Sequence, residues 1–217
     1  MNIYKTLKNL IFLTFLTICL VLPANANILP TSTKDLRTDA IGLYQLPQHI
    51  MIYKKPDAKS EVLYEANWDY KSFNASKGGA DRIFSVFVQE KELAYAQVID
   101  FTDDWLEIVY DKVAQRKGWI QAEDLRFMHW RNFYNIYGRK YGLKIFSDAP
   151  SSVKELHSST LEDSQTVQTI DKPSRIKLTV VKGNWALITA IENNNGNTGY
   201  LRWRSEDGVI FAFPNIK

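Results

Sequence analysis

Cysteine is nearly absent from this sequence, and the single one, Cys19, lies in an N-terminal segment that we expect to be removed. After removal, the chain has no thiol that could form a disulfide, attack a substrate or bind a metal ion. An exported chain without disulfides must be held together by its core, which is feasible at this length because the buried fraction of the surface grows with chain size.

Sequence signals of catalysis and cofactor binding are also missing. The three histidines, His49, His129 and His157, lie in unrelated contexts without metal-ligand spacing. The chain has no G-x-S-x-G nucleophile elbow and no glycine-rich phosphate loop, and Gly78 and Gly79 form a lone turn. We therefore predict no catalytic residue, no metal site, no cofactor and no enzymatic activity. An unrecognised hydrolase ranks third among the interpretations.

A large charge excess of either sign is absent as well. The chain has 27 Lys and Arg against 24 Asp and Glu, a net charge of +3, and Lys5 and Lys8 belong to the removable segment. Proteins that wrap nucleic acid usually carry a marked basic excess, so we predict no nucleic-acid partner. The 45% hydrophobic and 24% charged residues are typical of a soluble globular protein.

Residues 1–26 are predicted to be a signal peptide. Two lysines precede an uncharged apolar stretch at 10–22, Pro23 follows, and residues 24–26 read Ala-Asn-Ala, as a signal peptidase requires. A membrane anchor would need about 20 apolar residues, and this stretch is shorter. A lipoprotein would use Cys19, but Ile18 stands where a small residue is needed. The signal predicts a periplasmic or secreted protein with no membrane span after cleavage.

Short β-strands are predicted along the chain from residue 41 onward. Stretches rich in β-branched and aromatic residues alternate with polar or glycine-containing turns, and no long segment shows a period of 3.6. Asn193 and Asn194 begin the clearest turn, because asparagine and glycine accept a positive φ. The predicted strands lie at 50–53, 83–88, 94–101, 105–110, 119–121, 143–146, 176–181, 185–191, 198–204 and 209–213.

The two halves of this pattern form an internal repeat. Residues 103–108 lead through a hairpin to Gly118-Trp119-Ile120, and residues 183–188 lead through a hairpin to Gly199-Tyr200-Leu201. Upstream, residues 50–56 match residues 143–150. The repeat predicts two domains. It also places Trp105, Trp119 and Trp185 in their cores, since large rings bury much apolar area.

A strand with Trp-x-x-[Val/Ile], a polar hairpin and a Gly-[Trp/Tyr]-[Ile/Leu] strand resemble the bacterial SH3-like (SH3b) domain. The resemblance covers residues 41–125 and 141–213, and it implies two small β-barrels in tandem after a signal peptide. The predicted organisation is a signal peptide at 1–26, an N-terminal linker or frayed terminus at 27–40, a first SH3-like domain at 41–126 with an inserted loop at 66–82, an aromatic-rich bridge at 127–140 and a second SH3-like domain at 141–217.

Two aromatic segments are candidates for ligand binding. The bridge combines aromatic with basic residues, so that it either joins the two barrels or forms a groove for an anionic glycan, peptide or head group. The inserted loop either forms an extra strand or offers its rings to sugars and peptides. The predicted ligand-binding residues are Trp130, Arg131, Tyr134, Tyr137 and Trp203, with Trp68 and Tyr70 as the second choice, and their rings are expected to be partly exposed.

The resemblance implies a non-catalytic exported binding module of the bacterial cell envelope. Its partner would be a cell-wall glycan or peptide, as in peptidoglycan, or an envelope protein. The alternative is a protein–protein adaptor or an exported effector without affinity for the cell wall.

Overall fold

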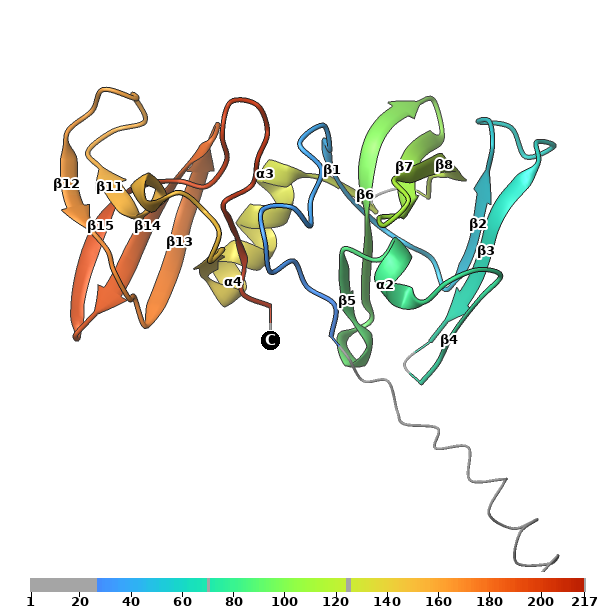
Figure 1. The fold of residues 1–217 in the computed structure, drawn as a ribbon, viewed down its shortest axis with the longest axis horizontal. Coiled ribbons are helices and arrows are strands. Elements are labelled where there is room, and N and C mark those ends of the chain that lie inside the picture. The colour runs from blue at the N-terminus through green and yellow to red at the C-terminus, as the bar shows by residue number, and fades with distance from the viewer. Residues whose placement is uncertain (1–26, 70, 124–125, 217) are drawn as a thin grey trace, which may run out of the picture.

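The computed structural model describes residues 27–69, 71–123 and 126–216. The predicted signal peptide and Tyr70 lie outside these residues. Two antiparallel sheets stand at the two ends of the molecule, with a helical segment between them (Figure 1). The predicted all-β class is confirmed. Across the described residues, no helix has the length and apolar character needed to cross a membrane.

The first sheet has nine strands. Its order is β4-β3-β2-β8-β7-β6-β1-β9, and β5 pairs with β6. The strands are β1 (Gly42–Gln45), β2 (His49–Tyr53), β3 (Val62–Trp68), β4 (Phe73–Ala75), β5 (Val86–Val88), β6 (Leu93–Thr102), β7 (Trp105–Asp111), β8 (Arg116–Gln121) and β9 (Phe127–His129), with the short helices α2 (Ala80–Ile83) and η1 (Gln89–Lys91) beside them.

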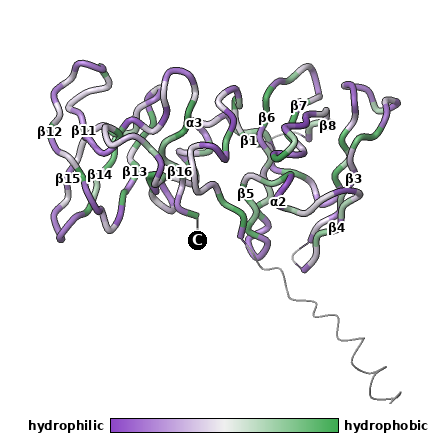
Figure 2. Tube along the Cα trace, in the orientation of Figure 1, coloured by the Kyte–Doolittle hydropathy of each residue, from purple (hydrophilic) through white to green (hydrophobic). Residues whose placement is uncertain are grey.

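The second sheet has seven strands in the order β12-β11-β15-β14-β13-β10-β16. The turns at the outer ends of both sheets consist largely of hydrophilic residues (Figure 2). The strands are β10 (Leu143–Ile145), β11 (Glu155–His157), β12 (Thr166–Thr169), β13 (Arg175–Lys182), β14 (Trp185–Glu192), β15 (Asn195–Arg202) and β16 (Ala212–Pro214), with the short helix η3 (Ser151–Lys154) before β11.

The two sheets repeat one topology. Strands β3-β2-β8-β7-β6-β1-β9 of the first sheet have the same order, in space and along the chain, as β12-β11-β15-β14-β13-β10-β16 of the second. The predicted match of residues 50–56 with 143–150 is therefore wrong by one strand, because β2 corresponds to β11 and β10 corresponds to β1. Comparing the two halves of the sequence did not identify the short strand β11. The SH3-like resemblance and the domain boundaries stay predictions.

The bridge is helical after β9. It consists of α3 (Trp130–Phe133), the π-helical turn η2 (Tyr134–Gly138) and α4 (Arg139–Tyr141). Its large rings at positions 130, 133, 134, 137 and 141 follow helical spacing, so that one face meets the core. One hydrophobic cluster contains Trp130, Phe133 and Tyr134 together with Leu43 of the first sheet and Ile188 of the second. The bridge thus packs the sheets onto a shared core.

The segment at 27–40 is neither a linker nor a frayed terminus. Ile28 exchanges two backbone hydrogen bonds of 2.8 Å with Phe87, and Leu36 and Ala40 are buried in the core. The backbone N–H of Thr33 donates to the Asp148 carboxylate at 3.0 Å. This segment therefore ties the first sheet to the second half of the chain.

The inserted loop at 66–82 contributes extra structure to the first sheet. Its first residues complete β3, β4 pairs with β3, and α2 follows. Trp68 is buried, its indole N–H donates to the Pro47 carbonyl at 2.7 Å, and its ring packs edge-on against Phe84 and Phe87. The strand interpretation of this segment is confirmed.

Candidate functional site

The bridge residues expected to bind a ligand are mostly consumed by packing. Trp130 is 3% exposed and its indole N–H donates to the Ala40 carbonyl at 2.6 Å. Tyr134 is fully buried and its hydroxyl donates to the Ala212 carbonyl at 2.5 Å. A buried ring cannot meet a ligand, so the expected partial exposure of these two rings is wrong.

The remaining predicted residues do not form a groove with them. Trp203 is buried, with its ring 4.2 Å from that of Tyr134. Tyr137 is half-buried and shares a 2.6 Å hydrogen bond between its hydroxyl and that of Tyr95, whose pKa is raised by burial. Arg131 is exposed, unlike the other predicted residues of the bridge. The structure joins these rings in the core because both sheets converge on the bridge.

An outward-facing aromatic cluster lies instead on the first sheet. We call Tyr53, Trp105 and Trp119 the first cluster. The three rings are half-buried. The Tyr53 ring meets the Trp105 ring edge-on with centroids 5.5 Å apart, and Trp119 is the direct cross-strand neighbour of Tyr53. Trp105 and Trp119 are therefore not core residues, contrary to the sequence-based prediction.

Strand alternation explains this placement. On β7, Leu106 and Ile108 point into the core, so Trp105 and Glu107 point to the opposite face. Glu107 is the cross-strand partner of Trp119, and its carboxylate forms a 2.9 Å ion pair with Lys117. The first cluster is thus a set of flat apolar rings beside a charged pair, held on rigid strands.

The second sheet carries an equivalent arrangement, which we call the second cluster: His157, Trp185 and Tyr200. His157 is the cross-strand partner of Tyr200, as Tyr53 is of Trp119. The His157 and Trp185 rings also meet edge-on, with centroids 5.0 Å apart.

Two glycines fix this shared register. A Cβ atom on Gly118 would approach the side chain of Ile52 and the carbonyl of Tyr53. A Cβ atom on Gly199 would approach Leu156 and the carbonyl of His157 in the same way. Gly118 lets β2 pass close to β8, and Gly199 lets β11 pass close to β15. Tyr53 and His157 therefore take equivalent positions in the two sheets.

The tryptophan of the second cluster is covered by a neighbouring side chain, whereas Trp105 of the first cluster is half-exposed. Trp185 is only 6% exposed, because the Arg202 guanidinium lies over its ring at 5.6 Å. Arg202 is the cross-strand partner of Trp185, whereas the exposed Gln121 holds that position beside Trp105. Trp185 is buried as predicted, but under Arg202 on the outer face of the sheet. It is the residue at which the two clusters differ in accessibility, since the other two residues of the second cluster are half-buried.

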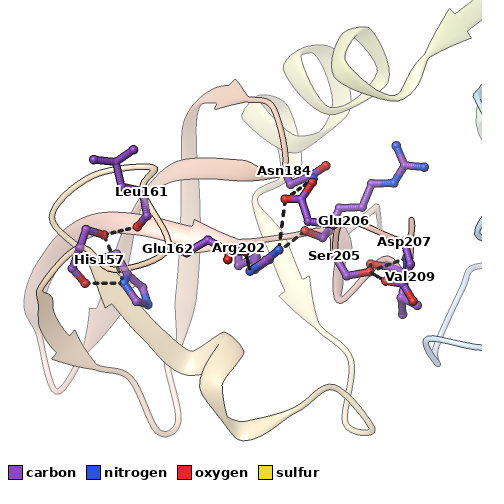
Figure 3. Close-up of polar contacts among 11 residues, drawn as sticks. His157, Leu161, Glu162, Asn184, Arg202, Ser205, Glu206, Asp207 and Val209 are labelled. Atoms are coloured by element: carbon purple, nitrogen blue, oxygen red, sulfur yellow. Dashed lines mark hydrogen bonds and ion pairs between the residues drawn. The ribbon is translucent and has the colours of Figure 1, made fainter.

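A polar network holds Arg202 in place. Its guanidinium donates to Glu162 at 2.6 Å and to Glu206 at 3.2 Å, and Glu206 also accepts from the Asn184 amide at 3.0 Å (Figure 3). The His157 ring, which contacts Trp185, has its Nδ1 atom 3.1 Å from the carbonyl oxygen of Ser164. These contacts border a cleft of about 500 Å³.

The lining of this cleft is acidic. It contains the carboxylates of Glu155, Glu162, Glu206 and Asp207 and the single guanidinium of Arg202. Within the described part of the chain, no group of three His, Cys, Asp or Glu side chains is placed to hold a metal ion. The arrangement provides recognition by rings, hydrogen bonds and charge.

Sequence reasoning named none of the residues of either cluster as a site residue. It predicted core positions for their three tryptophans and no binding role for Tyr53, His157 or Tyr200. The alternation of Trp105-Leu106-Glu107-Ile108 gave a signal for an outward Trp105, since two aliphatic residues share the opposite face. No local signal identified His157, because its role follows from pairing between β11 and β15.

No protein-family model matches the chain, and no curated protein is significantly similar to it. The functional argument therefore rests on the residues and geometry described above.

Proposed function

We propose that this protein is a non-catalytic, exported binding module of the bacterial cell envelope. Its ligand would be peptidoglycan or another envelope component, and the binding surface would be the first cluster. The observation that carries the proposal is the set of three half-exposed rings on the outer face of the first sheet. The resemblance to tandem bacterial SH3-like domains supports the same class of function.

The chemistry of the first cluster suits a sugar or a short peptide. Aromatic rings present flat apolar faces on which the C–H faces of a sugar or the side chains of a peptide can stack. The Glu107–Lys117 pair beside Trp119 offers an acceptor and a donor for hydroxyl or amide groups. Because the rings stand on paired strands, little conformational entropy is lost on binding.

Export is supported by the sequence alone. The predicted signal peptide at 1–26 directs the chain to the periplasm or the medium. The absence of a nucleophile motif and of metal-ligand spacing in the sequence favours binding over catalysis.

A pull-down with purified sacculi tests the proposal. The mature protein is expected to sediment with sacculi at low and at physiological salt. Trp105→Ala and Trp119→Ala should each leave most of the protein in the supernatant, since each removes a stacking face. The matched control is Val113→Ala, which changes another exposed apolar side chain, 70% accessible, in the β7–β8 hairpin. Circular dichroism must show all three variants folded.

Complete recovery of the wild-type protein in the supernatant at both salt concentrations would reject cell-wall binding. Equal sedimentation of wild type and both tryptophan variants would instead reject the first cluster as the binding surface.

The adaptor function is the second candidate, favoured by one observation. Phe101 is 57% exposed near the end of β6, next to Thr102, which pairs with Trp105. Phe101 pairs with Leu106, so its ring lies on the opposite face of the sheet from the first cluster, and an exposed ring there suits a peptide segment of a protein partner. Crosslinking followed by mass spectrometry would then give one dominant protein partner that Phe101→Ala loses and Trp105→Ala keeps.

A further inference from the structure

A cavity of about 860 Å³ opens where β10 and β13 diverge. The two strands pair at one position only, Leu143 with Ile176. In the first sheet the equivalent strands β1 and β6 pair at four consecutive positions, from Gly42 to Gln45. The cavity is thus a feature of the second half of the chain and shares no lining residue with the cleft at the second cluster.

The rim of this cavity is strongly basic. Lys140, Lys144, Lys154 and Arg175 line it, against the single carboxylate of Asp171. They come from four places in the chain: the end of the bridge, β10, the helix η3 and the start of β13. A cationic rim assembled from such separate elements reflects tertiary structure and not a local run of charge.

Little of this charge is neutralised within the protein. Lys154 and Asp171 form one exposed ion pair at 3.7 Å. Among the described residues, no ion pair joins Lys144 or Arg175 to a carboxylate. Like charges facing one cavity repel each other, and they raise the local concentration of anions. An anionic group entering the cavity would remove that repulsion.

The accessible apolar wall is formed by four half-buried residues, Tyr141, Ile145, Ala149 and Pro173. Leu143, Phe146 and Ile176 lie behind them in the hydrophobic core. The ammonium groups of Lys91 and Lys140 lie 5.3 and 5.1 Å from the centre of the Tyr141 ring, which marks the boundary between the charged rim and the apolar wall. A ligand that combines an anionic head with an apolar part would meet both the rim and this wall.

We propose that this cavity binds a phosphate-bearing amphiphile of net negative charge, with the phosphate at the basic rim and the apolar chain against the wall. Arg175 can donate two parallel hydrogen bonds to phosphate oxygens, and the lysines add mobile point charges. The proposal is independent of the first cluster, which lies on the other sheet.

Isothermal titration of the mature protein with a short-chain lysophosphatidylglycerol below its micelle concentration tests the proposal. Lysophosphatidylcholine of the same chain length is the zwitterionic probe, and inorganic phosphate is the probe for the head alone. The anionic amphiphile is expected to bind about tenfold more tightly than either, because inorganic phosphate has no apolar part and the choline cation of the zwitterionic lipid is repelled by the basic rim. Its affinity should fall as salt is added.

The double variant Lys144→Glu, Arg175→Glu should weaken this binding by about tenfold or more. The matched control Lys59→Glu, Lys177→Glu changes the net charge equally at exposed lysines that do not line the cavity, and it should bind as the wild type does. Equal affinity for the two lysolipids, equal affinity for inorganic phosphate, or unchanged binding by the cavity variant would each overturn the proposal.

Discussion

Tyr134 offers the sharpest test of the bridge as a structural element. Its side chain is fully buried, with the ring 4.2 Å from that of Trp203 and the hydroxyl 2.5 Å from the Ala212 carbonyl. Tyr134→Phe keeps the ring and removes only the hydrogen bond. Because a buried carbonyl then loses its donor, we expect a loss of about 1–3 kcal/mol in the free energy of unfolding.

Tyr134→Ala removes the ring as well and should cost about 3–5 kcal/mol, the range for emptying a large core site. The control is Ile136→Ala on the same helical segment. Ile136 is 50% exposed, so its truncation should change stability by no more than about 0.5 kcal/mol. Urea unfolding, followed by circular dichroism and tryptophan fluorescence, measures all three variants.

The same side chain gives a pH dependence with a definite sign. Burial raises the pKa of Tyr134 well above its usual value of roughly 10, so the native state keeps the phenol proton where the unfolded state loses it. Its contribution to stability is complete below about pH 10 and falls as the pH rises further. In Tyr134→Phe this alkaline loss should be smaller. An unchanged urea midpoint and an unchanged alkaline profile in Tyr134→Phe would refute the assignment of Tyr134 to the core.

Three further predictions concern other positions. Trp185→Ala should cost about 3–5 kcal/mol in thermal or urea unfolding, whereas half-buried Trp105 should cost about 1–2 kcal/mol on the same change; equal losses would contradict their different accessibility. Tyr64→Phe should be at least as stable as the wild type, because the Tyr64 hydroxyl has no hydrogen-bond partner among the described residues and burial raises its pKa to about 12. That variant should lose less stability above pH 10, and a stability loss at neutral pH would show that the hydroxyl has a partner. Asp148→Ala should lower the melting temperature at pH 7, since hydrogen bonds from Ser32 and the neighbouring Thr33 lower the pKa of Asp148 to about 2. Lowering the pH toward 2 removes this stabilisation from the wild type, so the two melting temperatures should converge there; a constant difference across the pH range would show that Asp148 acts in another way.

Local sequence patterns located ten of the sixteen described strands, because alternation and turn residues depend on near neighbours. They missed β1, β3, β4, β9, β11 and β12, and they placed Ile83 in a strand although it ends α2. The turn at Asn193 and Asn194 is present, with φ values of 50° and 65° that asparagine tolerates. The predicted strands at 105–110 and 185–191 end within a residue of β7 and β14. The all-β class follows from the same alternation, which few helical sequences imitate.

The inserted loop shows where local patterns stop being sufficient. Its alternating rings fit a strand or a binding loop, and the choice depended on whether the core beside the first sheet buries Trp68. Likewise, the ring spacing of the bridge fits a helix, but only the approach of both sheets buries Trp130 and Tyr134. Burial depends on partners that are remote in sequence.

The sequence by itself determined the all-β class, the repeated hairpins at β7–β8 and β14–β15 and the composition of the aromatic segments. Only the tertiary structure decided which rings face solvent. Trp105 and Trp185 occupy equivalent positions in the repeat, yet Arg202 and His157 cover Trp185 while Gln121 and Tyr53 leave Trp105 half-exposed. The physical reason is that strand pairing brings each ring's neighbours from other parts of the chain, and those neighbours set its accessibility.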